Sequence, residues 1–330
     1  MASIAFPSLA KKATLCDGTT YGYVSVPAST SSKPTFLLLH GFPSSCYDWR
    51  HQIIGLQREG YGVIAPDLLG YGDTDKPSDL TAYRMKVMSG HMVEIMEREG
   101  VLKAFAVGHD WGTTLASRLA NYHPNKFHAI VTLAVAYIQP GLKWNIDEIN
   151  ADLKKILGYE PYGYWTWYKT PQSTTDCNTH PASTFNLTYP TDPCLWRTNY
   201  APTGKAAEFV RANRTTPLPR WFSFDEYTTR NRIFAASGYE APLNWYRAAM
   251  AGVNDKDEEG LEEKCPLPNL FVGAEEDYVC VAWLQVKQTE EFVPVRRIEC
   301  WGCGHWVQLE EGERLNGLLR EFAGEVWRGD

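Results

Sequence analysis

VGHDWG, at residues 107–112, is the stretch of the sequence that decides the fold. It follows a short apolar run at 104–106 and precedes a run of helical character at 113–121, so it predicts a strand, a tight turn and a helix. Glycines flank the turn because its backbone is strained and because strand and helix pass close together there. We therefore expect Asp110 at the head of a buried sheet, with its side chain held clear of the backbone.

This pattern is typical of a nucleophile elbow, which carries a serine in lipases and esterases and carries a carboxylate here. A carboxylate at this position suits displacement at an sp3 carbon, which forms an ester on the enzyme that water then cleaves. Strained three-membered ethers and alkyl halides are the corresponding electrophiles. On the hexapeptide alone, the alternative is a surface aspartate in a turn that caps the following helix.

The segments around this turn alternate between apolar runs typical of strands and amphipathic runs typical of helices. The sequence predicts strands at 21–26, 35–39, 61–65, 127–138, 269–273 and 295–300, and helices at 47–58, 84–98 and 308–327. This alternation predicts an α/β fold, with a mostly parallel sheet covered by helices on both faces.

Residues 139–261 differ from the rest of the chain because they are rich in aromatic residues and lack short apolar strands. We interpret them as a mainly helical cap, inserted into a core formed by residues 1–138 and 262–330. Within the cap we expect helices at 145–157, 205–212 and 225–237, joined by proline-rich connections near 171, 181–193 and 215–220.

Composition excludes several classes of function. The chain of 330 residues can bury one large core, and its net charge of −7 with mixed signs argues against nucleic acid as a partner. No apolar run reaches the ~18 residues of a membrane span. The N-terminus lacks the pattern of a secretory signal and the eight cysteines are scattered, so we expect a cytoplasmic protein. Cys300 and Cys303 form a lone CxxC, which is weak support for a metal or redox site.

An aspartate nucleophile needs a base for the hydrolytic step and donors for the oxyanion that forms when water attacks the ester. Asp277 and His305 each follow a predicted strand, in the chain order nucleophile, acid, histidine. We expect His305 to act as the base and Asp277 to orient it. The backbone N–H groups of Phe42 and Trp111 are the candidate oxyanion donors, and His109 should have a structural role.

The chain resembles the soluble epoxide hydrolases of the α/β-hydrolase fold family. The resemblance is carried by HGFP at 40–43, DLLGYGDTDKP at 67–77, the elbow itself, AEEDYV at 274–279 and CGHW at 303–306. It implies two ring-opening tyrosines, which fall on Tyr246 and on Tyr164, with Tyr159, Tyr162 and Tyr168 as competitors for the second position. The chain departs from the family at Trp165, where a glutamine is common, and at Leu69, where an arginine is common.

We therefore expect an epoxide hydrolase that needs no metal and no organic cofactor. Asp110 attacks a ring carbon, the two tyrosines protonate the ring oxygen, and water activated by His305 releases a vicinal diol. Aromatic residues of the cap and core, with Trp165, Trp245 and Trp306 as candidates for contact with the substrate, predict an apolar epoxide. Either a monomer or a homodimer is compatible with the sequence.

Two alternative functions share this fold. A haloalkane dehalogenase uses the same elbow and triad but needs N–H donors for a halide, and Phe42 stands where an asparagine would have supported that function. A non-catalytic receptor for hydrophobic ligands would keep the cavity without needing a triad. The presence of all three triad candidates argues against the receptor.

Overall fold

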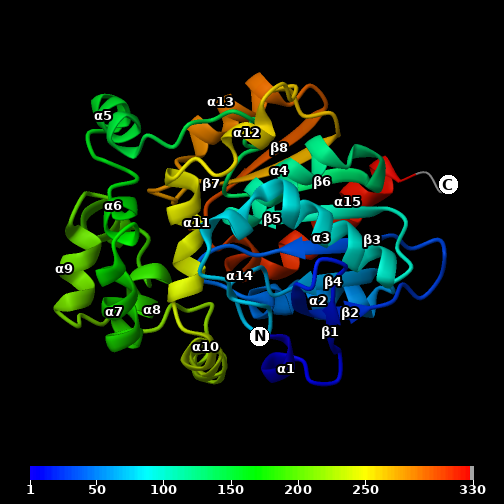
Figure 1. The fold of residues 1–330 in the computed structure, drawn as a ribbon, viewed down its shortest axis with the longest axis horizontal. Coiled ribbons are helices and arrows are strands. Elements are labelled where there is room, and N and C mark those ends of the chain that lie inside the picture. Colours follow the sequence, from blue (N-terminus) through cyan, green and yellow to red (C-terminus); the bar gives the residue numbers. More distant parts are fainter. Residues whose placement is uncertain (328–330) are drawn as a thin grey trace.

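The apolar runs of the sequence form the strands of one sheet in the computed structural model, which describes residues 1–327 (Figure 1). The strands are β1 (Ala10–Thr14), β2 (Thr20–Val26), β3 (Thr35–Leu39), β4 (Gly62–Pro66), β5 (Ala104–His109), β6 (Phe127–Leu133), β7 (Asn269–Ala274) and β8 (Arg296–Trp301). Their order in the sheet is β1-β2-β4-β3-β5-β6-β7-β8. β2 is antiparallel to both of its neighbours, and the remaining pairs are parallel. The predicted fold class is thereby confirmed.

Helices cover both faces of this sheet. Outside residues 139–261, the α-helices are α1 (Ala2–Ala5), α2 (Arg50–Arg58), α3 (Met85–Arg98), α4 (Trp111–Tyr122), α13 (Ala282–Phe292), α14 (Val307–Glu310) and α15 (Gly312–Val326). Short 3₁₀ helices are η1 (Cys46–Trp49), η2 (Leu80–Tyr83) and η3 (Pro124–Lys126). The sequence predicted a single last helix at 308–327, but the backbone breaks at Glu311, which leaves the helical region between α14 and α15.

Successive residues of the central strands face two different cores. In β3, Phe36 packs in the core beneath α2 and α15, whereas Leu37 packs in the core beneath α3 and α4. Phe105 and Ala106 alternate in the same way along β5. Because both faces are covered, these strands need apolar side chains at every position, which explains their continuous apolar runs.

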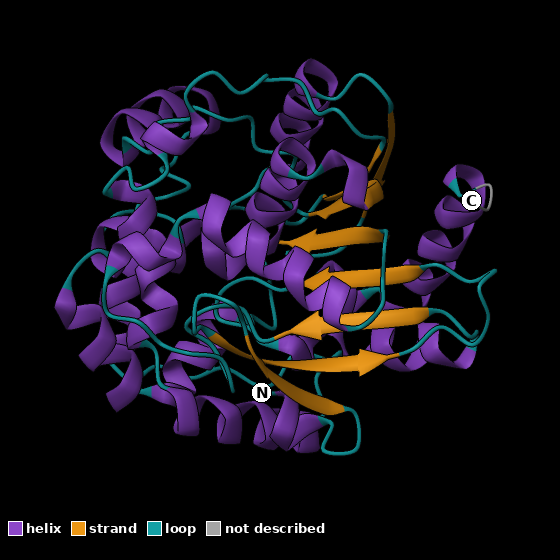
Figure 2. Cartoon of the chain, turned by 45° about the vertical axis from the view of Figure 1, so that its right-hand side comes forward, coloured by secondary structure: helices purple, strands orange, loops and turns teal. Residues whose placement is uncertain are grey.

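The segment between β6 and β7 is helical, and we call residues 139–261 the insert. Its helices are α5 (Ile146–Leu157), α6 (Tyr164–Tyr168), α7 (Pro171–Thr179), α8 (Pro181–Thr188), the π-helix η4 (Trp196–Tyr200), α9 (Lys205–Arg211), α10 (Phe224–Ser237), α11 (Glu240–Met250) and α12 (Asp255–Glu258). Figure 2 shows most strand arrows pointing toward this group of helices, so the insert lies at the carboxyl ends of the parallel strands. Its treatment as a separate cap stays a prediction.

Two of the expected proline-rich connections are wrong. α7 and α8 begin at Pro171 and Pro181, the first residues of their helices. Proline is accepted there because the N–H group that it lacks has no partner within the helix at that position. α11 was also missed, and β1 was not predicted as a strand.

One buried ion pair lies at both places where the chain crosses between the sheet and the insert: where it leaves the sheet and where it returns. Arg118 on α4 donates from Nε to Oε1 of Glu258 at 2.5 Å. Its Nη1 and Nη2 groups donate to the carbonyl oxygens of Ile138 (2.7 Å) and Gln139 (3.1 Å), where the chain leaves the sheet. Oε2 of Glu258, where the chain returns, accepts the N–H of Gly141 at 2.7 Å. Both crossings are therefore tied to the helix that follows the elbow.

Two further expectations concern the whole chain. Among residues 1–327, no helix has both the length and the apolar character needed to cross a bilayer. All eight cysteines are free thiols, with Cys300 exposed and Cys303 buried, so the CxxC pair forms no disulfide.

Candidate active site

The turn between β5 and α4 holds Asp110 in a backbone conformation that is rare for a residue with a side chain. Its φ is 55° and its ψ is −123°. A Cβ atom added at Gly108 would lie 2.5 Å from the carbonyl oxygen of Gly112, and one added at Gly112 would lie 2.0 Å from the carbonyl oxygen of Leu39. Only glycine fits at these two positions, so the local sequence fixes the bend and the bend presents the carboxyl group.

The end of β3 supplies a hydrogen bond to this carboxyl group. The backbone N–H of Phe42 donates to Oδ1 of Asp110 at 2.8 Å. His40 holds the preceding loop, because its Nδ1 lies 2.9 Å from the carbonyl oxygen of Gly41 and its Nε2 accepts the N–H of Leu68 at 3.0 Å. Burial lowers the pKa of His40, which keeps the ring neutral. The other predicted donor, the N–H of Trp111, directly follows Asp110 in the chain.

The loops after β7 and β8 bring Asp277 and His305 to the same place. Nε2 of His305 lies 3.7 Å from Oδ2 of Asp110, and its Nδ1 lies 2.5 Å from Oδ2 of Asp277. Oδ1 of Asp277 accepts the N–H groups of Val279 and Cys280 at 2.8 and 2.9 Å. The structure therefore brings together the three residues that the sequence proposed as a triad, with the histidine between two carboxylates.

The charges of these three groups are coupled. Burial alone would lower the pKa of His305, but the charges and hydrogen bonds of Asp277 and Asp110 outweigh it and raise this pKa to about 10. Burial would likewise raise the pKa of Asp110, yet His305 and the Phe42 N–H bring it below its usual value. In the resting site the nucleophile is thus an ionised carboxylate facing an imidazolium.

His305 gives the stability of the fold a pH dependence of defined sign. Its pKa is 6.5 in the unfolded chain and about 10 in the folded chain, so the stabilisation is fully present below pH 6.5 and is lost as the pH rises towards about 10. We expect the free energy of unfolding of the native sequence, relative to that of His305→Gln, to fall across this interval. Urea denaturation at several pH values and constant ionic strength measures it. A relative stability that rises with pH would contradict the assigned charge.

His109, the neighbour of the nucleophile, points away from the cavity, as the sequence suggested. Its Nε2 lies 2.9 Å from the carbonyl oxygen of His305, and its Nδ1 lies 3.2 Å from Nε2 of Gln308. Burial, and then the positive charge of His305, lower the pKa of His109 to about 3. A neutral ring that donates from Nε2 and accepts at Nδ1 satisfies both contacts. Gln308 was not singled out in the sequence, because no motif marks it.

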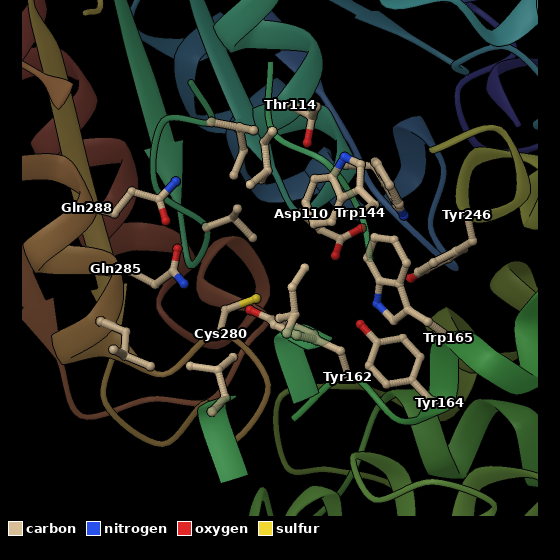
Figure 3. A pocket seen from close by; sticks show the side chains of 17 residues that line it. Asp110, Thr114, Trp144, Tyr162, Tyr164, Trp165, Tyr246, Cys280, Gln285 and Gln288 are labelled. Carbon is tan, nitrogen blue, oxygen red and sulfur yellow. The ribbon is translucent and has the colours of Figure 1, made fainter. Parts of the chain in front are cut away.

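Two tyrosines of the insert face the nucleophile. Tyr246 lies on α11 and Tyr164 on α6, with ring centroids 6.0 Å apart. Figure 3 shows their hydroxyl groups pointing toward the part of the cavity that Asp110 enters. Burial, followed by neighbouring phenols and by Asp110, raises both pKa values well above the usual range, so the phenols stay protonated.

The competitors of Tyr164 are placed differently. Tyr159 donates to the carbonyl oxygen of Tyr278 at 2.8 Å, and the hydroxyl of Tyr168 lies 3.2 Å from that of Tyr200. Tyr162 lines the same main cavity as Tyr164, but Tyr164 also lines a smaller cavity together with Asp110, His305 and Tyr246, and Tyr162 does not. Tyr164 therefore remains the candidate for the second ring-opening tyrosine.

A cavity of about 280 Å³ begins at Asp110 and extends between the sheet and the insert. Its aromatic lining consists of Trp111, Trp144, Tyr162, Tyr164, Trp165 and Tyr246, and its aliphatic lining of Val135, Ile138, Leu142, Ile149, Leu153 and Leu284. Thr114, Cys280, Gln285 and Gln288 complete it, and Asp110 is the one charged residue in this lining.

The three tryptophans predicted to contact the substrate have different positions. Trp165 lines the cavity. Trp245 does not, and that prediction is wrong: its Nε1 donates to the carbonyl oxygen of Leu69 at 2.8 Å, which anchors α11 on the loop after β4. Trp306 stacks on Tyr189 with ring centroids 4.1 Å apart and lies beside His305 rather than in the main cavity.

A second, much smaller cavity also borders the nucleophile. Its volume is about 10 Å³, and Asp110, His305, Tyr164, Tyr246 and Trp306 are among the residues that line it. About 10–15 Å³ of this kind of volume is what one water molecule needs. The site therefore has a place for a single water next to both the histidine and the nucleophile.

Metal binding does not fit this cluster. Potential ligand atoms of Asp277, Cys280 and His305 lie within 4.8 Å of one another. However, both oxygens of Asp277 already accept hydrogen bonds, and burial raises the pKa of Cys280 well above its usual value, which keeps it a thiol. The two carboxylates of Asp277 and Asp110 instead favour a positively charged His305 between them.

Comparisons with known proteins identify the family of the fold. Residues 34–312 match the family described as alpha/beta hydrolase fold. The chain is similar to bifunctional epoxide hydrolase 2 of Mus musculus, with 28% identity over 91% of this chain and 54% of that protein. It is also similar to epoxide hydrolase 3 of Siraitia grosvenorii, with 32% identity over 67% of this chain and 68% of that protein. A solved structure, the epoxide hydrolase from an endophytic Streptomyces, superimposes with a TM-score of 0.81 at 27% identity and covers 96% of this chain and 95% of that one. The chain spans about half the length of the mammalian relatives.

Proposed function

The chain belongs to the α/β-hydrolase fold family, and from this premise we propose that it hydrolyses an apolar epoxide to a vicinal diol through an ester on Asp110. The observation that carries the proposal is one cavity in which a carboxylate nucleophile faces two neutral phenols. A carboxylate can be alkylated by an epoxide carbon, and a phenol can protonate the departing ring oxygen. Relatives named epoxide hydrolases support this assignment.

The first step opens the ring. Oδ2 of Asp110 attacks a ring carbon while Oδ1 stays in its hydrogen bond with the Phe42 N–H, so Oδ1 becomes the carbonyl oxygen of the ester. The carbon–oxygen bond of the epoxide breaks, and the ring oxygen takes a proton from Tyr246 or Tyr164. Phenols suit this role because a stronger acid would already be ionised at neutral pH.

The second step cleaves the ester with water. Alkylation neutralises Asp110, which removes one of the two carboxylates that raise the pKa of His305, so the imidazolium passes its proton to the phenolate left by the first step and becomes a neutral base. Water in the small cavity attacks the ester carbon, and the Phe42 and Trp111 N–H groups stabilise the oxyanion. His305 takes a proton from the attacking water and gives it to the departing alkoxide as the acyl–oxygen bond breaks, and the diol leaves with Oδ2. The proton of the regenerated carboxylic acid then passes to His305, which restores the carboxylate and the imidazolium.

This scheme predicts the route of oxygen. In a single turnover in ¹⁸O water, with enzyme in excess, we expect the first diol to carry unlabelled oxygen from Asp110. The label should enter the carboxyl group of Asp110, since water attacks the ester carbon. Mass spectrometry of the diol and of a peptide containing residue 110 measures both. Label in the first diol would mean that water attacks the epoxide directly, and would overturn the ester mechanism.

The cavity supports an apolar substrate. Its walls are aromatic and aliphatic, and its one charged group is the nucleophile, so it offers no cation to a charged ligand. Styrene oxide is a suitable first substrate, and 1-bromobutane is the matched electrophile for a haloalkane dehalogenase. Hydrolysis of 1-bromobutane but not of styrene oxide would favour that alternative.

We also propose a cytoplasmic location, which the eight unpaired cysteines support. The reaction as proposed uses only side chains, backbone N–H groups and water.

A further inference from the structure

Two glutamines line the cavity on the side away from the ring-opening tyrosines. Gln285 and Gln288 lie one turn apart on α13, whereas Tyr246 and Tyr164 come from the insert. Figure 3 shows the two amide groups on one side of the cavity and the tyrosines on the other, with Asp110 between them. A ligand that reaches from the nucleophile towards α13 therefore meets amides.

The orientation of the Gln285 amide is fixed by the backbone. The N–H of Ala136 donates to its Oε1 at 2.8 Å, and an N–H group cannot donate to the nitrogen end of an amide. The nitrogen end, Nε2, is therefore the one left for the cavity. Gln285 is only 7% exposed, and its Nε2 has no hydrogen-bond acceptor among residues 1–327.

The Gln288 amide is fixed in the opposite sense. Its Nε2 donates to the carbonyl oxygen of Tyr137 at 2.9 Å and to Oε1 of Gln139 at 3.3 Å. A backbone carbonyl oxygen can only accept, so the Gln288 atom next to it must be the amide nitrogen. This nitrogen donates within the protein, and the amide oxygen of Gln288 remains available as an acceptor. The two amides therefore offer one donor end and one acceptor end, each held in place by the backbone next to the end of β6.

This combination selects the chemistry of a ligand group. A donor beside an acceptor matches a group that both accepts and donates, such as a hydroxyl or a carboxamide. A carboxylate fits poorly, because it only accepts and because the lining contains no cation to balance its charge. A purely hydrocarbon end would leave the buried Gln285 N–H groups without an acceptor.

We propose that Gln285 and Gln288 form a subsite for an uncharged hydroxyl or amide group at the far end of the epoxide substrate. The inference rests on the proposed function. The substrate is then a hydrocarbon with an epoxide at one end, held at Asp110, and a neutral hydrogen-bonding group at the other, held on α13.

Matched substrates test the subsite. For several chain lengths, kcat/KM is measured for a 1,2-epoxyalkane, its ω-hydroxy and ω-methoxy derivatives, and its ω-carboxylate. At the chain length that spans the cavity, we expect the hydroxy compound to exceed the alkane by roughly fivefold to thirtyfold, as one or two net hydrogen bonds imply. The methoxy compound, which only accepts, should gain less, and the carboxylate should fall below the alkane.

Gln285→Met removes the donor, because a thioether carries no N–H or O–H group. We expect the advantage of the methoxy compound over the alkane to disappear, since the ratio of the two kcat/KM values reports the lost hydrogen bond. Gln57→Met, at an exposed position of α2, makes the same chemical change and should leave every ratio unaltered. Gln288→Met removes the acceptor and provides a second variant, in which the hydroxy compound should lose its lead over the methoxy compound.

The outcomes separate the two proposals. Hydrolysis of the alkane series with equal kcat/KM for all ω-groups at every chain length would overturn the subsite and leave the epoxide hydrolase standing. A Gln285→Met variant that loses activity by the same factor on all substrates, with the native ratios retained, would show a structural effect and would also overturn it. Absence of hydrolysis of every epoxide would overturn both proposals.

Discussion

Replacement of Asp110 by alanine is expected to abolish epoxide hydrolysis. Asp110 is the one carboxylate in the lining of the cavity, and the bend between β5 and α4 presents it to the substrate. No other residue of the lining can therefore form the ester in its place. Loss of a covalent nucleophile lowers kcat by on the order of 10⁴-fold or more. Diol formation from styrene oxide, followed by chromatography, measures the effect.

Asp152→Ala is the matched control, since Asp152 is an exposed residue of α5. This variant should retain full activity. Circular dichroism and the midpoint of urea unfolding show whether Asp110→Ala is folded. A folded Asp110→Ala variant with activity within tenfold of the native chain would mean that Asp110 is not the nucleophile.

Replacement of His305 by glutamine is expected to trap the ester. Asp110 can still attack the epoxide, because it keeps the hydrogen bond from the Phe42 N–H, but the water loses its base. We expect one equivalent of epoxide to be consumed without release of diol. Intact-protein mass spectrometry should then show a mass increase equal to that of the epoxide, located by peptide mapping at residue 110.

Two controls make this result specific. Asp110→Ala/His305→Gln should show no added mass, because the alkylated group is gone. His180→Gln, which changes a histidine at the start of α8, should turn over and accumulate no ester. Consumption of the epoxide by His305→Gln without any covalent adduct would contradict the two-step scheme.

The sequence predicts the parts of the site that depend on the course of the backbone. Glycines 108 and 112 allow a close passage of strand and helix that a Cβ atom would block, so they reveal the elbow. The chain order places Asp277 and His305 after adjacent strands. The carboxyl ends of parallel strands meet at one edge of the sheet, which brings these residues together without any knowledge of side-chain packing.

The sequence does not predict the parts of the site that depend on the direction in which a side chain points. Trp245 and Trp165 are equally aromatic in the sequence, but one anchors α11 to a carbonyl oxygen of the core and the other lines the cavity. Gln285 and Gln288 have no motif, because their role comes from contacts with residues 136 to 139, about 150 positions earlier in the chain. Pro171 and Pro181 suggested connections because proline ends helices as well as starting them.

The contact of Arg118 and Glu258 with both crossings of the chain has a mechanical consequence. Both ends of the insert are held at α4 by the same ion pair, so neither end can leave the core without exposing an unpaired buried charge. Trp245 ties α11 to the loop after β4 as well. Tyr246, which lies on α11, therefore keeps its place opposite Asp110 through two independent attachments of the insert.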